Sequence, residues 1–399
     1  MSKRTLGLVP APGRPEKLVE KLIEILPEVL SRVVDDRISW EIECETNTLA
    51  SSSEYINENI DRADDIRRKN NWDMVIAVTD LPSLSERKVV ISEFNQEKGI
   101  SIISLPALGC FKLKQKLQNL IIHHVEILYG SGSSEENGEV KSQFIDKITS
   151  VTPEEDNDSS KRYIIKSTVT GWSRLVVGMT YINEPWTVLT GFKTIVSLAF
   201  ATGTYISIFS GAWELSLEYE LWRFLLGMFI AVSGMTGWLI YAHRLWEKKS
   251  HNSQTLYRSL YNLTTLLTVT SVTLVNYAIV FVLLTISILL FVPPDLFGSW
   301  TPADPNTSWN DYFNLIWFAS SLGILAGALG STVEDEDKIR NVTYSYRQLY
   351  RHEQIEKEDE TESYEESGES ESKTQDESEE ETEEYEGQKQ AHRESEEAE

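Results

Sequence analysis

The chain has 399 residues, a formal net charge of −25 and a mean hydropathy of −0.27. The charge is uneven: residues 353–399 contain 22 acidic and 4 basic residues and so carry 18 of the 25 net negative charges. The remaining 352 residues are only mildly acidic, which excludes a strongly basic nucleic-acid-binding protein, and we expect no nucleic-acid partner.

The N-terminal segment and the cysteines bear on the compartment of the first domain. Residues 1–17 contain no apolar core of signal-peptide length, so we expect membrane insertion to come from internal segments. Two cysteines, Cys44 and Cys110, are too few for a disulfide framework. Free thiols in a reducing compartment are the simplest interpretation, and they fit a cytosolic domain.

The first half of the N-terminal region alternates between strand and helix patterns. Residues 5–12, "TLGLVPAP", indicate a strand that ends in proline and glycine, and residues 14–34 have apolar side chains at helical spacing. Residues 39–46 alternate like a half-buried strand. Residues 56–72 form a polar helical pattern that predicts an exposed helix.

The second half of this region continues the alternation. Residues 72–82 contain a nearly continuous apolar run, which is typical of a central strand covered on both faces. Residues 87–94 and 99–109 predict two strands, and the short "NQEKG" between them favours a hairpin. Residues 110–130 predict a closing helix. Residues 1–130 are therefore expected to form an α/β domain with a mixed sheet.

Three polar residues are expected at strand ends, where ligands bind in open α/β sheets. Thr79 and Asp80 follow the apolar strand, and Ser104 ends another strand. We interpret them as a candidate ligand-binding group. The alternative is that Asp80 only caps a turn, a common role for aspartate after a strand. No glycine-rich phosphate loop of dinucleotide or P-loop spacing occurs.

The closing helix contains two adjacent histidines and a glutamate, His123, His124 and Glu126. A helical zinc site needs two histidines four residues apart, so that both rings lie on one face. Adjacent residues diverge by about 100° around the helix axis. His123 and Glu126 share a face, but two ligands do not make a tight site. We expect no metal and no cofactor, and histidines at the helix surface or the domain edge.

A linker and a juxtamembrane segment follow the domain. Residues 131–160 are rich in Ser, Glu, Asp and Asn and predict a flexible acidic linker. Residues 161–187 form a juxtamembrane segment, in which the period of residues 163–182 is ambiguous. This stretch is expected either to lie along the membrane surface or to pack under the membrane helices.

Residues 188–332 are expected to form an all-α bundle of four transmembrane helices. Each predicted span is about 20 residues or longer, enough to cross a hydrocarbon core of about 30 Å. The spans are residues 188–210, 221–241, 262–292 and 312–331.

Lysine and arginine cluster in the loops after the second and fourth spans, and the other two loops have none. The positive-inside rule therefore predicts a multi-pass protein of the inner cell membrane with both termini in the cytoplasm.

Small residues at four-residue spacing suggest close helix packing, either within the bundle or between copies of the chain. One group lies on the second span and one on the fourth: Ser233 and Gly237, then Ala319, Gly323, Gly327 and Ser331. The expected partners are the lipid bilayer and a second copy of the chain. No ionisable residue lies deep in a span, which gives a transporter or channel little support.

Two segments follow the spans. Residues 333–352 form a basic cytosolic segment. Residues 353–399 are Glu- and Ser-rich with almost no aliphatic side chains, so we predict a disordered acidic tail.

Two resemblances rest on short motifs. The layout of residues 1–130, from "LGLVPAP" through "VTDLP" and "GISIISLPALG" to the helix after Lys112, resembles the N-terminal part of archaemetzincin-type zinc peptidases. That family has HExxH on the comparable helix, and this chain has "LIIHHVEILYG" there. The resemblance therefore implies at most a related scaffold without the catalytic metal.

The second resemblance is to a family of uncharacterised bacterial multi-pass membrane proteins with a "TDLP…SLPALG" cytosolic domain. It includes "NEPW" before the first span, "LAGALGS" in the fourth and "YSYRQ" after it, and it covers about residues 1–350. It implies the same architecture and no activity.

These patterns favour an integral membrane protein with a cytosolic, non-enzymatic binding or sensory module. The alternative is a membrane-bound hydrolase with an atypical site, using Asp80, His123, His124 and Glu126. A transporter or channel subunit ranks third. No intact catalytic motif is present in the sequence.

Overall fold

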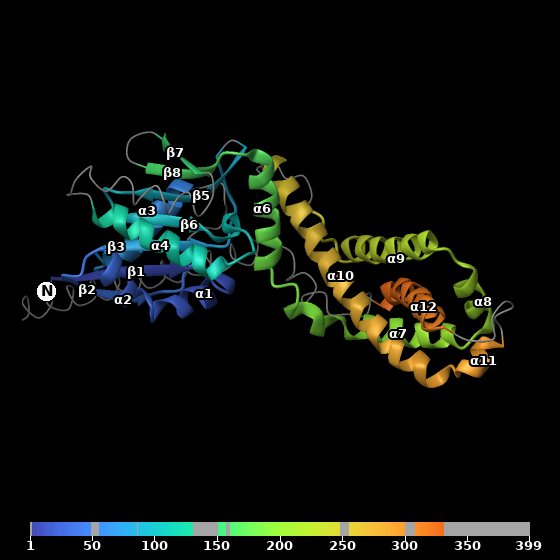
Figure 1. Ribbon diagram of the computed structural model, residues 1–399. Coiled ribbons are helices and arrows are strands. Elements are labelled where there is room, and N and C mark those ends of the chain that lie inside the picture. Colours follow the sequence, from blue (N-terminus) through green and yellow to red (C-terminus); the bar gives the residue numbers. More distant parts are fainter. Residues whose placement is uncertain are drawn as a thin grey trace, which may run out of the picture. The chain divides into compact units, whose positions relative to one another are not determined.

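The computed structural model describes residues 2–48, 56–85, 87–130, 151–156, 160–247, 255–299 and 308–330. Its N-terminal part is an α/β domain with a mixed sheet (Figure 1). The strands are β1 (Ser2–Pro10), β2 (Ile38–Cys44), β3 (Met74–Thr79), β4 (Ser83–Ser85), β5 (Lys88–Asn95), β6 (Ile100–Ser104), β7 (Val151–Asp156) and β8 (Ser160–Ile165). The helices are α1 (Arg14–Ile23), α2 (Leu26–Val33), α3 (Ile56–Lys69), the 3-10 turn η1 (Leu105–Leu108) and α4 (Leu113–Tyr129).

The sheet of the described residues has the order β2-β1-β3-β6-β5-β8-β7, with β4 paired to β5. Strands β2, β1, β3 and β6 run parallel, and β5, β8 and β7 extend the sheet in antiparallel fashion. The carboxyl ends of β1, β3 and β6 therefore meet at one edge, which we call the carboxyl edge. The hairpin predicted for β5 and β6 is present.

The predicted helix over residues 14–34 is two helices, α1 and α2, separated at residues 24 and 25. Pro27 lies in the first turn of α2 and has no backbone N–H to continue the ladder of α1. A proline at this position is tolerated at a helix start but not in a helix interior. The apolar spacing runs through both helices, which is why the pattern alone predicted one.

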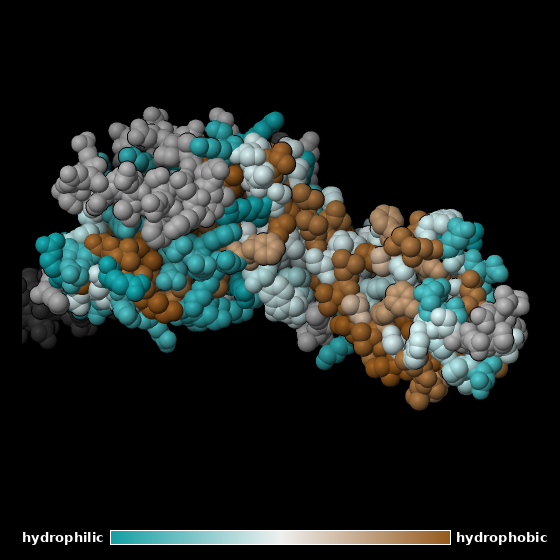
Figure 2. Space-filling model, viewed as in Figure 1, coloured by the Kyte–Doolittle hydropathy of each residue, from teal (hydrophilic) through white to brown (hydrophobic). Residues whose placement is uncertain are grey.

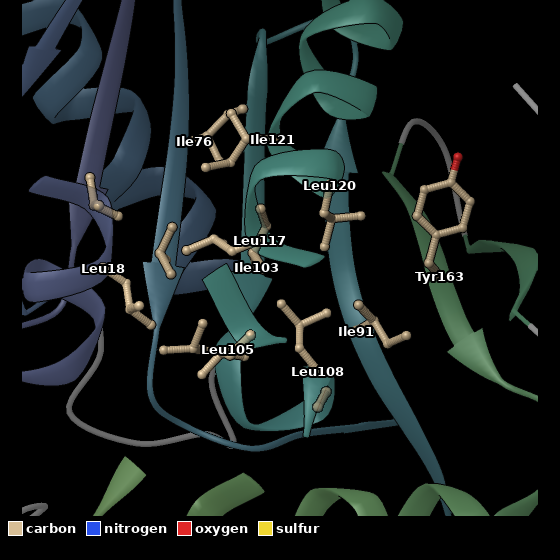
Figure 3. Close-up of a cluster of buried hydrophobic side chains, with 14 of the residues drawn as sticks. Leu18, Ile76, Ile91, Ile103, Leu105, Leu108, Leu117, Leu120, Ile121 and Tyr163 are labelled. Atoms are coloured by element: carbon tan, nitrogen blue, oxygen red, sulfur yellow. The ribbon is translucent and has the colours of Figure 1, made fainter. Parts of the chain in front are cut away.

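Helices cover both faces of the sheet. Helices α1, α2 and α4 share one apolar core with the strands, and Leu117, Leu120 and Ile121 of α4 lie over Ile76 and Ile103 (Figure 3). On the other face, α3 packs through Ile60 and Ala63. Strand β3 is buried on both sides, as its continuous apolar run predicted.

Part of the predicted linker belongs to the sheet. Residues 151–156 form β7, which pairs with β8, and β8 pairs with the edge of β5. The ambiguous stretch 163–182 divides into the end of β8 and helix α6 (Thr168–Ile182), which begins after the Ser167 N-cap. The remaining linker residues, 131–150 and 157–159, lie outside the described residues.

The C-terminal part of the described chain is helical (Figure 1). Three of its helices are long and apolar enough to span a membrane: α9 (Leu221–Ala242), α10 (Thr255–Phe291) and α12 (Trp309–Gly330). Shorter elements accompany them: η3 (Thr187–Phe192), α7 (Lys193–Ser207), α8 (Ser210–Glu218) and α11 (Pro294–Gly298). By length and composition these three helices are candidate membrane spans.

The predicted first span, residues 188–210, is not one straight helix. Helix α7 has 15 residues and is followed by α8 after a bend of 88°. Fifteen residues rise only about 22 Å, less than a hydrocarbon core of about 30 Å. The described residues therefore contain three candidate spans, or four if α7 and α8 are taken as one broken span. A bundle of four straight spans is not observed.

The two groups of small residues have different surroundings. Ala319, Gly323 and Gly327 of α12 are buried against α7. A Cβ at Gly323 would lie 2.6 Å from the Ala199 carbonyl oxygen, so only glycine permits this approach. Ser233 and Gly237 of α9 are exposed, and self-association through that face stays a prediction. Ser331 lies outside the described residues.

Hydrophobic residues gather over α10 and its neighbouring helices, whereas hydrophilic residues predominate over the α/β domain (Figure 2). Exposed apolar side chains on α9 include Leu225, Phe229 and Ile230, which face outward from the helix packing. Such a surface suits contact with lipid rather than water. The predicted segments 333–352 and 353–399 lie outside the described residues.

Candidate functional site

The loop after β3 lies at the carboxyl edge and contains the predicted residues Thr79 and Asp80. The Thr79 hydroxyl accepts a hydrogen bond from the Leu81 amide at 3.0 Å. Ser104, at the end of β6, donates from its hydroxyl to the Leu81 carbonyl at 2.7 Å. Thr79 and Ser104 therefore hold the loop between β3 and β4 in place. Asp80 is 2% exposed.

The free space beside this loop is small. A cavity of about 30 Å³ is lined by Thr79 and Ser104, together with Glu93 and other residues of β5. That volume suits about one or two water molecules, far below the 300–1,000 Å³ of typical small-molecule sites. Thr79 and Ser104 are neighbours on β3 and β6, and their hydrogen bonds to Leu81 fit a structural role in the turn. Their role in ligand binding stays a prediction.

The two histidines of α4 are buried, not at the helix surface as expected. Nε2 of His123 lies 2.8 Å from the Tyr163 hydroxyl, and Nε2 of His124 lies 2.9 Å from the Ser92 hydroxyl. The sheet extension by β8 supplies Tyr163, so residues 160–165 cover this part of α4. A sequence pattern that ends the domain at residue 130 leaves these histidines exposed, which explains the wrong expectation.

The histidine rings do not converge on one point. Their centroids are 5.9 Å apart, and their Nε2 atoms have different partners. Nδ1 of His123 is 3.9 Å from Glu126 Oε2. Among the residues that the structure describes, no three His, Cys, Asp or Glu side chains gather as metal ligands. Burial lowers the pKa of His124 well below its usual value, and the neighbouring His123 adds to this effect.

A larger groove lies at the carboxyl edge, beside α1, the start of α4 and the end of α6. Its volume is about 460 Å³, within the range of small-molecule sites. We call it the basic groove. Its lining residues are Arg14, Leu18, Cys110, Lys112, Leu113, Lys114, Gln115, Gln118 and Tyr181.

One wall of the basic groove is fixed by an ion-pair network. The Arg14 guanidinium donates to Glu184 at 2.9 Å and to the Tyr181 hydroxyl at 2.9 Å. Lys17 Nζ lies 3.0 Å from the other Glu184 oxygen. Desolvation alone would raise the pKa of Glu184, but Lys17 and Arg14 outweigh it and lower that pKa. Glu184 thus neutralises much of this wall.

The opposite wall carries unbalanced positive charge. Lys112 and Lys114 begin α4, and no carboxylate in the described ranges pairs with either of them. Lys112 has a left-handed backbone, with φ of 49°, and is the N-cap position of α4. The groove therefore presents two lysines beside a helix N-terminus, an arrangement that favours anionic groups.

Helix α6 contacts both the α/β domain and a membrane helix. Against η1, Arg174 donates to the Leu108 carbonyl at 2.9 Å, and a Cβ at Gly178 would lie 2.0 Å from the Pro106 carbonyl oxygen. Further along α6, Asn183 donates to the Thr268 hydroxyl at 3.2 Å, and the Thr264 hydroxyl contacts the Met179 sulfur at 3.6 Å.

The membrane helix also reaches the domain core. Tyr257, Leu260 and Tyr261, near the start of α10, belong to the apolar cluster that α4 and the sheet share. We call the contacts of α6 with η1 and α10 the α6 joint. The basic groove borders this joint, because Tyr181 lines the groove and lies on α6 between Met179 and Asn183.

The basic groove was not predicted from the sequence. Its residues come from three segments far apart in the chain, and none forms a recognisable motif. The available signals were indirect: Arg14 and Lys112 each flank a predicted helix start after a predicted strand. At the carboxyl edge of an α/β sheet, such positions lie close together.

Comparison with known proteins supplies no family: no family model, no curated protein and no solved structure matches the chain.

Proposed function

We propose that the chain is a membrane-anchored binding or sensory protein rather than an enzyme. Its α/β domain takes a small anionic ligand in the basic groove and transmits occupancy to the membrane helices through α6. The observation that carries this proposal is the position of Tyr181. Its side chain lines the groove, and it lies between Met179 of α6 and Asn183, the C-cap residue of α6, both of which contact α10.

The charge of the groove supports an anionic ligand. Lys112 and Lys114 face a volume of about 460 Å³, while Arg14 is already bound to Glu184 and Tyr181. Carboxylates and phosphates form strong, charge-assisted hydrogen bonds with lysine. A ligand that also reached Arg14 would compete with Glu184 for it. Ligand binding would thereby disturb the residues just before η3 and the membrane helices.

The packing of α6 supports transmission. One part of the helix lies against η1 with a glycine at the contact, and another part is hydrogen bonded to α10. Packed helices shift as units, by about 1–2 Å in many switching proteins, because close-packed interiors do not absorb such movements. A shift of α6 therefore moves the start of α10.

The compartment follows from the loop charges. Counting α7 and α8 as one broken span gives four spans, and lysine and arginine then concentrate on one side of them. We therefore place the protein in the inner cell membrane with both termini in the cytoplasm. The α/β domain and the basic groove then face the cytosol, where small anionic metabolites are available.

The two native cysteines allow a direct test. Cys110 lines the basic groove and Cys44 lies on β2, away from the groove lining. A bulky maleimide adduct at Cys110, in the variant Cys44→Ser, occupies the groove in place of a ligand. We expect this adduct to change hydrogen–deuterium exchange in α6 and in residues 255–268 of α10.

The matched control is the adduct at Cys44 in the variant Cys110→Ser. Because the raised pKa of Cys44 slows its reaction, labelling is continued until mass spectrometry shows complete conversion. The adduct adds the same group to the same domain, and we expect exchange in α10 to remain as in the unlabelled protein. Equal exchange in α10 for both adducts and for unlabelled protein would show that groove occupancy does not reach the membrane helices. That result would refute the sensory part of the proposal.

A further inference from the structure

A second groove lies between the membrane helices α9 and α12. Its volume is about 430 Å³. Aromatic contacts hold the two helices together beside it: Phe224 stacks on Trp317 at 5.6 Å between ring centroids, and Tyr219 meets Phe318 edge-on at 5.7 Å. The groove lies next to these contacts, between residues 226–230 of α9 and residues 321–325 of α12.

Gly227 forms part of the floor of the groove. A Cβ at Gly227 would meet no atom within 4 Å, so the backbone of α9 forms an open floor there. Leu226 and Ile230 of α9 form one wall, and Leu322 and Leu325 of α12 form the other. Apart from Arg223 and Ser321 the lining consists of apolar and aromatic residues. Residues 224–230 of α9 rise about 9 Å along it.

The groove opens on the surface that faces lipid. Leu226 and Ile230 are 47% and 49% exposed, and both lie on a helix long and apolar enough to span a membrane. An occupant of this groove therefore enters from the bilayer, and the part of it that lies along Gly227 is apolar.

The mouth of the groove carries one cation. Arg223 is the third residue of α9, where a long side chain reaches the interface, and its guanidinium lies over Tyr219 at 5.3 Å and over Trp222 at 5.4 Å. Two carboxylates precede it in the chain. Glu220 accepts a hydrogen bond from Trp222, and no described carboxylate forms an ion pair with Arg223.

We propose that this groove is a binding site for an anionic phospholipid of the surrounding bilayer. The phosphate is held by Arg223 between Tyr219 and Trp222, and one acyl chain lies over Gly227 between the leucine and isoleucine walls. The apolar groove and the unpaired cation at its mouth match the two parts of such a lipid.

Native mass spectrometry of the full chain, released from micelles with added lipid, tests the site. We expect phosphatidylglycerol to be retained about fivefold more than phosphatidylcholine, the ratio that one interfacial arginine supplies. In Arg223→Gln this ratio falls close to one. Lys193→Gln removes a charge from α7, outside the groove lining, and keeps the wild-type ratio.

A second pair of variants tests the groove itself. Gly227→Phe starts from a position where an added Cβ meets no atom within 4 Å, and its ring occupies the groove, so we expect retention of both lipids to fall several-fold. Gly237→Phe adds the same ring on the same helix at a site that is equally open, and retention stays as in the wild type.

Two results would overturn the proposal. One is an unchanged lipid ratio in Arg223→Gln, which would mean that the arginine holds no phosphate. The other is equal retention by Gly227→Phe and Gly237→Phe, which would mean that lipids bind adventitiously on the outer surface. Lys193, Arg223 and Gly237 are exposed and Gly227 is half-buried. A cooperative thermal unfolding transition, with a midpoint no lower than that of the wild type, confirms that each variant is folded.

Discussion

The α/β domain keeps its large apolar side chains inside, whereas α9, α10 and α12 turn many of theirs outward. Leu117 of α4 is 0% exposed, but Leu290 of α10 is 72% exposed. The same residue type thus faces protein in one region and the surroundings in the other. The difference shows that the two regions are built for different solvents, water for the domain and hydrocarbon for the helices.

The regions also differ in how they bring elements together. In the α/β domain, branched and aromatic side chains fill the space between helices and sheet. In the helical region, α12 approaches α7 through Gly323 and Gly327, because helices in lipid associate by close backbone packing. Removal of side-chain volume should therefore destabilise the α/β domain most, whereas addition of side-chain volume should destabilise the contact between α7 and α12 most.

The largest expected effect contrasts two leucines. Leu117→Ala removes a buried side chain and should lower the free energy of unfolding by about 2–5 kcal/mol, through lost burial and a cavity. Leu290→Ala removes an outward side chain and should cost less than about 0.5 kcal/mol. Denaturant unfolding in mixed micelles measures both. A large loss of unfolding free energy in Leu290→Ala would contradict this contrast, because it would mean that Leu290 packs against protein.

The next effect concerns added side-chain volume at two glycines of the helical region. Gly323→Ala places a methyl group 2.6 Å from the Ala199 carbonyl oxygen, and we expect a loss of about 1–3 kcal/mol from overpacking. Gly237→Ala meets no atom within 4 Å and should gain up to about 1 kcal/mol from helix propensity. Thermal unfolding in detergent measures whether each variant is less or more stable than the wild type. A change of the same sign in both variants would contradict the close contact between α7 and α12.

A pH effect should belong to the α/β domain. Burial, with His123 nearby, holds the pKa of His124 well below its ordinary value of 6.5, so the folded domain keeps this ring neutral while the unfolded chain protonates it. Stability is therefore full above pH 6.5 and falls as the pH drops below it, by about 1.4 kcal/mol per unit. The measurement is the urea midpoint at pH 7.5 and 5.5.

The matched variant is His124→Gln, which retains a hydrogen-bonding group for Ser92 and cannot titrate. Its stability at pH 7.5 will be lower, but the drop between the two pH values should shrink. An undiminished drop in this variant would assign the pH dependence to another group.

The smallest expected effect is on the rate at which Cys44, in the α/β domain, reacts with maleimide. Desolvation and the carboxylates of Glu20 and Glu16 raise the pKa of the Cys44 thiol to about 11. In Cys110→Ser, maleimide labelling of Cys44 should be slow at pH 7 and rise about tenfold per pH unit, following the thiolate fraction. A rate that levels off near pH 8.5 would indicate an ordinary thiol.

Local patterns predicted most elements of the α/β domain. Strand β3 was predicted from its apolar run and the β5–β6 hairpin from its short connection, because both depend on neighbouring residues. The break between α1 and α2 was missed, since Pro27 interrupts an apolar spacing that continues on both sides. Strand β8 was missed because its pairing with β5 joins residues about 70 positions apart.

The functional sites depend on the same distant pairing. Tyr163 covers His123 only because β8 joins the sheet, and Tyr181 reaches Arg14 only because α6 packs at the carboxyl edge. Spacing along one helix predicts that adjacent histidines diverge, but it could not predict their burial. The bend after α7 was also not predictable from hydropathy, which averages over a break in the backbone.

Hydrogen–deuterium exchange of the full chain decides whether the α6 joint couples the α/β domain to α10. Gly178→Ala places a methyl group against the Pro106 carbonyl oxygen and pushes α6 away from η1, while Gly211→Ala on α8 meets no atom. We predict faster exchange in residues 255–268 of α10 for Gly178→Ala and no change for Gly211→Ala. Faster exchange confined to η1 and the sheet, with α10 unchanged, would contradict the account.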